Sequence, residues 1–145
     1  LAKSYSNLGK LLHDVKKSDE AEELCCEALT RYQQLVEKNP AQYSEGLAMI
    51  YNELGEISYD GGRTAEAEAL YRKARTIYRA LWEREPMRYS KALSHVCFNL
   101  LDLTANLDRY EEAKDFLIEG IDAMNAGTVQ QTDTCTSSDN LCESR

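Results

Sequence analysis

Residues that carry out acid–base or nucleophilic chemistry are few in this sequence and do not form a recognisable active-site pattern. The chain has two histidines, His13 and His95. General acid–base catalysis requires a partner within hydrogen-bond reach, and the sequence offers neither histidine an evident one. Residues 60–63 read DGGR, but the Lys-Ser/Thr that completes a phosphate-binding loop does not follow. We therefore expect the two glycines to form a turn and the chain to have no catalytic residues.

The five cysteines do not show the spacing of a metal site either. Cys25 and Cys26 are adjacent, so on a helix they would project about 100° apart and could not clamp one ion without further ligands. Cys25 and Cys97 fall on apolar faces, where free cysteine behaves as a small core residue. We expect these two to be buried, Cys26 to be more exposed, and neither a metal nor another cofactor to be bound.

The composition, with two prolines, seven glycines and a predominance of Ala, Glu, Leu, Lys and Arg up to about residue 124, predicts an all-helical protein. The net charge of −8 and the pI near 4.8 argue against a nucleic-acid interface, which needs clustered Lys and Arg. No apolar stretch approaches the roughly 20 residues that cross a bilayer, and free cysteines fit a reducing compartment. We expect a cytoplasmic location, and partners that are neutral, bipolar or basic.

The elements that would position any site are repeated. Sliding the chain against itself by 46 residues aligns residues 1–46 with 47–92 at 18 identities without a gap. The alignment continues into a third copy: Leu8 falls on Leu54 and Leu100. A repeat of this length is typical of stacked supersecondary units.

Each copy has the pattern of two helices. In the second copy the first helix is predicted over residues 41–59, from apolar residues at three- and four-residue steps. Gly61 and Gly62 supply the turn, and the second helix ends before Pro86, which suits the first turn of the next helix. Ala67 and Ala74 lie on the face of the second helix that meets the first.

This pattern resembles the tetratricopeptide repeat family. The signature of a large residue, Leu-Gly and another bulky residue, then two spaced alanines and a late proline, is met in the first copy by Tyr5, Leu8, Gly9, Leu12, Ala21, Ala28 and Pro40. The third copy departs from it, with Cys97, Leu101 and Gly120 at signature places. The unit is also about three helical turns longer than the family's roughly 34 residues.

The resemblance implies an all-α solenoid of three antiparallel helical hairpins in a right-handed superhelix. We place the repeats at residues 1–46, 47–92 and 93–124, the first beginning inside a helix, and expect residues 125–145 to be a disordered polar tail or linker. Cys135 and Cys142, in that tail, are expected to be free.

The resemblance also implies a function: a protein-interaction scaffold whose concave groove, lined by the first helix of each hairpin, binds an extended peptide or a partner helix. Asn52 is the best candidate to hold a ligand backbone, because its amide both donates and accepts hydrogen bonds. The candidate groove residues are Lys3, Ser6, Lys10, His13, Met49, Asn52, Glu56, Tyr59, His95, Phe98 and Asp102.

Two alternatives stay open. The chain could be a sensor or regulatory arm of a larger ATPase or transcription regulator, or a self-association module. The second rests on the last helix, where Phe116, Leu117, Ile118, Ile121 and Met124 form a broad apolar stripe. Terminal repeats usually need a polar outer face, so this stripe would form a homo-oligomer or meet another repeat or the tail.

Overall fold

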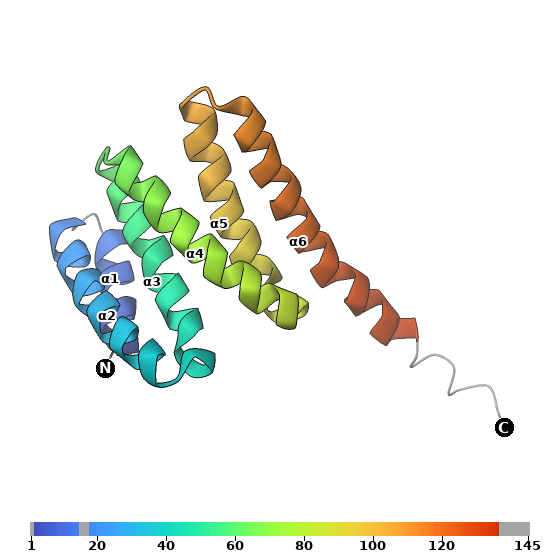
Figure 1. Ribbon diagram of the computed structural model, residues 1–145, viewed down its shortest axis with the longest axis horizontal. Helices are drawn as coiled ribbons and strands as arrows, with labels where there is room; N and C mark the ends of the chain where they lie inside the picture. The colour runs from blue at the N-terminus through green and yellow to red at the C-terminus, as the bar shows by residue number, and fades with distance from the viewer. Residues whose placement is uncertain (1, 15–17, 137–145) are drawn as a thin grey trace. The chain divides into compact units, whose positions relative to one another are not determined.

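The computed structural model describes residues 2–14 and 18–136, with the side chains of residues 10, 12–14, 18 and 129–136 left out. The described chain contains six helices and no strand: α1 (Ala2–Asp14), α2 (Ser18–Lys38), α3 (Pro40–Asp60), α4 (Thr64–Arg84), α5 (Pro86–Asn106) and α6 (Tyr110–Thr136). Consecutive helices form three hairpins, α1–α2, α3–α4 and α5–α6 (Figure 1). The predicted all-α fold of repeated helical hairpins is confirmed.

The chain divides into two compact units, Leu1–Tyr78 and Arg79–Arg145. The first unit contains α1, α2, α3 and most of α4. The second contains the end of α4 together with α5 and α6. The boundary therefore falls inside a helix rather than in a linker.

Proline starts the first helix of the second and third hairpins. Pro40 and Pro86 stand in the first turn of α3 and α5, where a missing N–H costs nothing. Asn39 caps α3, since its side-chain oxygen accepts a hydrogen bond of 3.3 Å from the backbone N–H of Gln42. The observed α3, Pro40–Asp60, is one residue longer at each end than the predicted 41–59.

The two described hairpin turns close in the same way. Gly62 has a φ of 76°, and Asp108, at the equivalent place in the third copy, has a φ of 57°. Glycine takes this left-handed conformation without cost, and aspartate is one of the few other residues enriched in it. The N–H of Arg63 donates to the carbonyl of Ser58 at 2.8 Å, and the N–H of Arg109 donates to that of Thr104 at 2.9 Å. These bonds satisfy carbonyls at the ends of α3 and α5.

Small residues let the two helices of a hairpin approach closely, as predicted. Ala67 and Ala74 are fully buried, and a Cβ placed on Gly55 would lie 2.6 Å from the ring of Tyr71 on α4. In the third copy the close approach uses different residues: a Cβ on Gly120 of α6 would lie 2.9 Å from the ring of Phe98 on α5. Close packing is therefore kept where the repeat signature is lost.

The first unit has one continuous apolar core that joins the first two copies. Leu54 and Ile57 of α3 share a buried cluster with Ala21 and Cys25 of α2. We call this contact between α2 and α3 the seam. At its rim, a guanidinium nitrogen of Arg63 lies 2.9 Å from a carboxylate oxygen of Glu22. Glu22 of α2 therefore links the first hairpin to the turn between α3 and α4.

The last helix is longer than expected. We predicted a polar tail from Asn125, but α6 continues to Thr136. Gly127 explains part of the extension, because a Cβ there would lie 2.8 Å from the Ser90 hydroxyl near the start of α5. Packing against α5 therefore stabilises helix in a stretch whose composition favours a loop. Residues 137–145, including Cys142, lie outside the described part.

Candidate protein-binding surface

The predicted groove residues come from the first helix of each hairpin and occupy a few repeat positions. Six of these residues have exposed or half-buried side chains, and we call this set the helix A face. It consists of Lys3, Met49, Glu56, Tyr59, His95 and Asp102. Lys10 and His13 belong to α1, but their side chains lie outside the described residues.

One repeat position is exposed in all three copies. Lys3, Met49 and His95 are 46 residues apart in turn, and each is exposed on its helix, Met49 at 39%. An exposed methionine offers a flexible apolar contact, and Lys and His offer polar ones. The exposed side chain at this position is therefore a feature that the three copies share.

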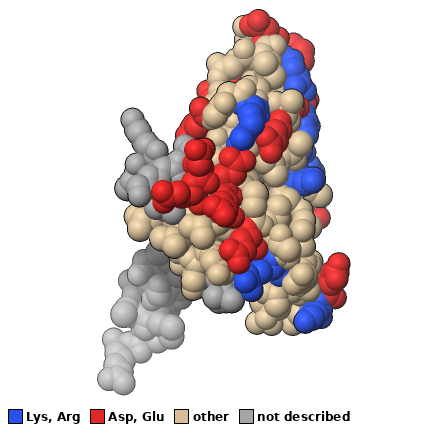
Figure 2. Space-filling model, turned by 90° about the vertical axis from the view of Figure 1, so that its left-hand side faces the viewer, with Lys and Arg blue, Asp and Glu red and all other residues tan. Residues whose placement is uncertain are grey.

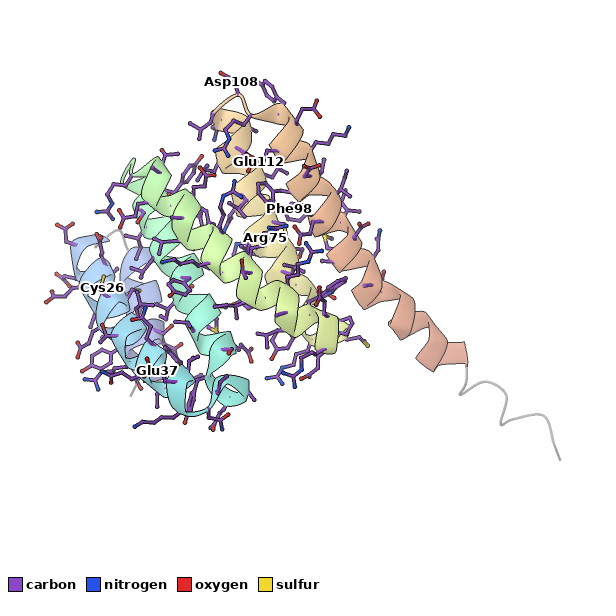
Figure 3. The ribbon with its side chains drawn as sticks, in the orientation of Figure 1. Cys26, Glu37, Arg75, Phe98, Asp108 and Glu112 are labelled. Atoms are coloured by element: carbon purple, nitrogen blue, oxygen red, sulfur yellow. The ribbon has the colours of Figure 1, made fainter. Side chains whose placement is uncertain are left out.

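A second position is used for packing. Ser6 is 4% exposed and Asn52 is 7% exposed. Phe98, at the same place in the third copy, is half-buried and lies close to Gly120. Figure 3 shows Phe98 between α5 and α6. The Asn52 amide donates a hydrogen bond of 2.9 Å to a carboxylate oxygen of Glu56. The ligand-holding role of Asn52 stays a prediction, and it would require this bond to open.

The remaining positions carry carboxylates and an aromatic ring. Glu56 and Tyr59 are half-buried on α3, and Asp102 is exposed on α5. The Asn106 amide donates to Asp102 at 3.4 Å. Asp60, at the end of α3, is also exposed. Negative charge therefore recurs on the helix A face of the second and third copies.

The structure brings only some of these residues together. α1 and α3 pack in the first unit, which holds Lys3, Met49, Glu56 and Tyr59. His95, Phe98 and Asp102 belong to α5 in the second unit. A binding surface can be described from the first unit alone.

A separate acidic region lies on α2. Glu20, Glu23 and Glu27 of α2 are all exposed. Figure 2 shows carboxylates gathered on the face that it views. Glu20 stands in the first turn of α2, where negative charge complements the helix dipole. This region is part of the second helix of its hairpin and is not part of the helix A face.

The three cysteines with described side chains lie as predicted, whereas the side chain of Cys135 and all of Cys142 lie outside the described part. Cys25 and Cys97 are fully buried, and Cys26 is exposed. Burial, with a smaller contribution from Glu53, raises the pKa of the Cys25 thiol to about 12. Desolvation and the nearby Glu22 also raise the pKa of Cys26. Neither thiol is activated as a nucleophile, since activation requires a lowered pKa.

The described residues contain neither a metal-ligand cluster nor a membrane-spanning helix. No three His, Cys, Asp or Glu side chains among the described residues are arranged to hold a metal ion. Within residues 2–14 and 18–136, no helix is long and apolar enough to span a bilayer.

Sequence reasoning missed one feature at the start of the chain. Leu8 is a signature residue expected to pack, yet it is 46% exposed, and Leu11 is 59% exposed. The aligned Leu54 is 5% exposed and Leu100 is fully buried. The repeat alignment predicts which face of the helix Leu8 occupies, but it does not predict which neighbours cover that face.

Comparisons with known proteins agree with this architecture. The tetratricopeptide repeat family matches residues 1–80. The crystal structure of BtubC (BKLC) from P. vanneervenii superposes with a TM-score of 0.72 at 24% identity, covering 86% of this chain. The alignment spans only 47% of BtubC, and at this identity it shows the fold alone. No curated protein matches the chain. With the family covering more than half of its residues, the chain belongs to the tetratricopeptide repeat family.

Proposed function

We propose that this chain is a protein-interaction module whose helix A face binds an extended peptide or a partner helix. Tetratricopeptide repeats are generally modules of protein–protein interaction. One observation supports this face in particular. The same repeat position is exposed in all three copies, as Lys3, Met49 and His95, although the neighbouring position is buried in the first two as Ser6 and Asn52.

The energetics of binding would be divided between apolar and charged contacts. Met49 and Tyr59 supply apolar contact in the first unit, and such residues dominate affinity in protein interfaces. Exposed charge pairs contribute about 0–1 kcal/mol each, so Glu56 and Asp102 would set preference and orientation. Because both are negative, the preferred partner is neutral, bipolar or basic rather than acidic. We place this interaction in the cytoplasm and expect neither nucleic acid nor membrane to take part.

The proposal is tested by affinity capture of binding partners. Three forms of the chain serve as baits in parallel: the parent, Met49→Glu and Leu107→Glu. Met49 and Leu107 are exposed at 39% and 45%, so both variants introduce the same charged residue at an accessible apolar position. Leu107 lies in the turn after α5, outside the helix A face. A partner of the helix A face is retained by the parent and by Leu107→Glu, and its recovery on Met49→Glu falls at least about tenfold, as for an interface hot spot. Equal recovery on all three baits would contradict the proposal.

A further inference from the structure

The last helix leaves an apolar face uncovered. We call Leu117, Ile118, Ile121 and Met124 the α6 end face; their exposed fractions are 39%, 48%, 44% and 49%. The opposite side of α6 is buried, with Ala113, Phe116 and Ala123 at 4%, 4% and 1% exposed. Of the five residues in the stripe predicted from the sequence, Phe116 is therefore buried and the other four are exposed.

The first helix also leaves an apolar face uncovered. The α1 end face consists of Leu8 and Leu11, exposed at 46% and 59%. At the equivalent places in the second copy, Leu54 and Ile57 are exposed at 5% and 2%. In the third copy, Leu100 and Leu103 are fully buried. Only in the first copy is this side of the helix accessible.

The α6 end face and the α1 end face correspond, by repeat position, to the two sides of the α2–α3 seam in the first unit. In the first unit, Leu54 and Ile57 of α3 are covered within a cluster that includes Cys25 and Tyr32 of α2. Cys25 and Tyr32 align, 92 residues later, with Leu117 and Met124 of α6. Leu117 and Met124 of the α6 end face therefore occupy the repeat positions of the α2 side of the seam, and the α1 end face occupies those of the α3 side.

We propose that two copies of this chain associate head to tail, with the α6 end face of one copy on the α1 end face of the next. The contact would reproduce the α2–α3 seam between chains. Such a contact uses different patches on the two partners, so it leaves one end free on each and can extend beyond a dimer.

The charge distribution favours this orientation at long range. Residues 1–17 carry four lysines and one aspartate, a net charge of +3. Residues 110–136 carry one lysine and six acidic residues, a net charge of −5. Opposite net charges at the two ends accelerate encounter and disfavour like ends meeting.

One local charge opposes it and gives a specific test. Inside the first unit, Arg63 pairs with Glu22 at 2.9 Å across the rim of the seam. The counterpart of Glu22 on α6, 92 residues later, is the exposed Lys114. Replacing Lys114 by Glu would restore the negative charge that Glu22 supplies inside the first unit.

The experiment is sedimentation velocity under reducing conditions, from about 10 µM to about 1 mM, a range that covers weak association. The parent should form species that grow with concentration. The variants Leu8→Glu/Leu11→Glu and Leu117→Glu/Ile121→Glu should each stay monomeric, yet form a dimer and nothing larger when mixed, because each retains one intact face. Met87→Glu, a matched control exposed at 48% near the start of α5, should associate like the parent. Helicity by circular dichroism checks that every variant is folded.

Further outcomes separate this contact from others. Lys114→Glu should strengthen association several-fold at low salt and less at high salt, and Lys114→Gln by a smaller factor. A parent that is monomeric throughout would overturn the proposal. So would an α1 end-face variant that still dimerises alone, which would indicate contact between two α6 helices. These results do not depend on the capture experiment, since none of the end-face residues belongs to the helix A face.

Discussion

At the residue scale, the buried thiol of Cys25 gives a pH dependence with a definite sign. Burial and Glu53 raise its pKa from 9.0 to about 12 in the folded chain. Between these values the unfolded chain loses a proton that the folded chain keeps, so the thiol's contribution is present below pH 9 and is lost as the pH rises toward 12. We therefore predict that the difference in unfolding free energy between the parent and Cys25→Ala shrinks from about pH 8 to about pH 11. Urea unfolding of both proteins at both pH values measures this difference. Subtracting the unfolding free energy of the variant from that of the parent removes the contribution of other titrating groups. A constant difference would show that the thiol is not desolvated.

At the element scale, the fit between paired helices depends on small side chains. Ala67 of α4 is fully buried, and the repeat pattern predicts that it faces α3, so Ala67→Leu should overpack the hairpin and lower the unfolding free energy by about 1–3 kcal/mol. The control is Ala65→Leu, two residues earlier and exposed, which should change it by no more than about 0.5 kcal/mol. Thermal unfolding followed by circular dichroism compares them. If both variants melt like the parent, Ala67 does not face α3.

The elements themselves were predictable where short-range signals agreed with the repeat. Pro40, Pro86 and Gly62 mark helix starts and a turn by backbone restrictions that operate in any context. The end of α6 could not be predicted, because the composition past Asn125 favours a loop and the close approach of Gly127 to Ser90 joins residues far apart in sequence. Burial of Asn52 was missed for a similar reason, since the repeat alignment gives its helix face but not which neighbours cover it. The role of the helix A face remains a prediction from family resemblance and exposure.

At the scale of the whole molecule, charge should govern which partners bind. The variant Glu56→Lys/Asp102→Lys reverses both carboxylates on the helix A face. It should weaken a basic or bipolar partner by up to roughly tenfold at low salt, with the loss shrinking as salt screens the charges. Glu20→Lys/Glu23→Lys changes the net charge equally but acts on α2, and should bind nearly as the parent does. Titration calorimetry across a salt series compares them. An equal loss in both variants would indicate a nonspecific effect of net charge.

The three methionines allow the most direct test that the helix A face is the binding surface. Met49 lies on that face, Met124 on the α6 end face and Met87 near the start of α5, and all three are exposed. With ¹³C-methyl methionine, the chain should give three methyl signals in an NMR spectrum. On addition of a captured partner, we predict that the Met49 signal shifts or broadens and that the signals of Met87 and Met124 stay in place. A shift of Met124 with an unchanged Met49 would contradict the account and move the binding site to the end of the repeat array.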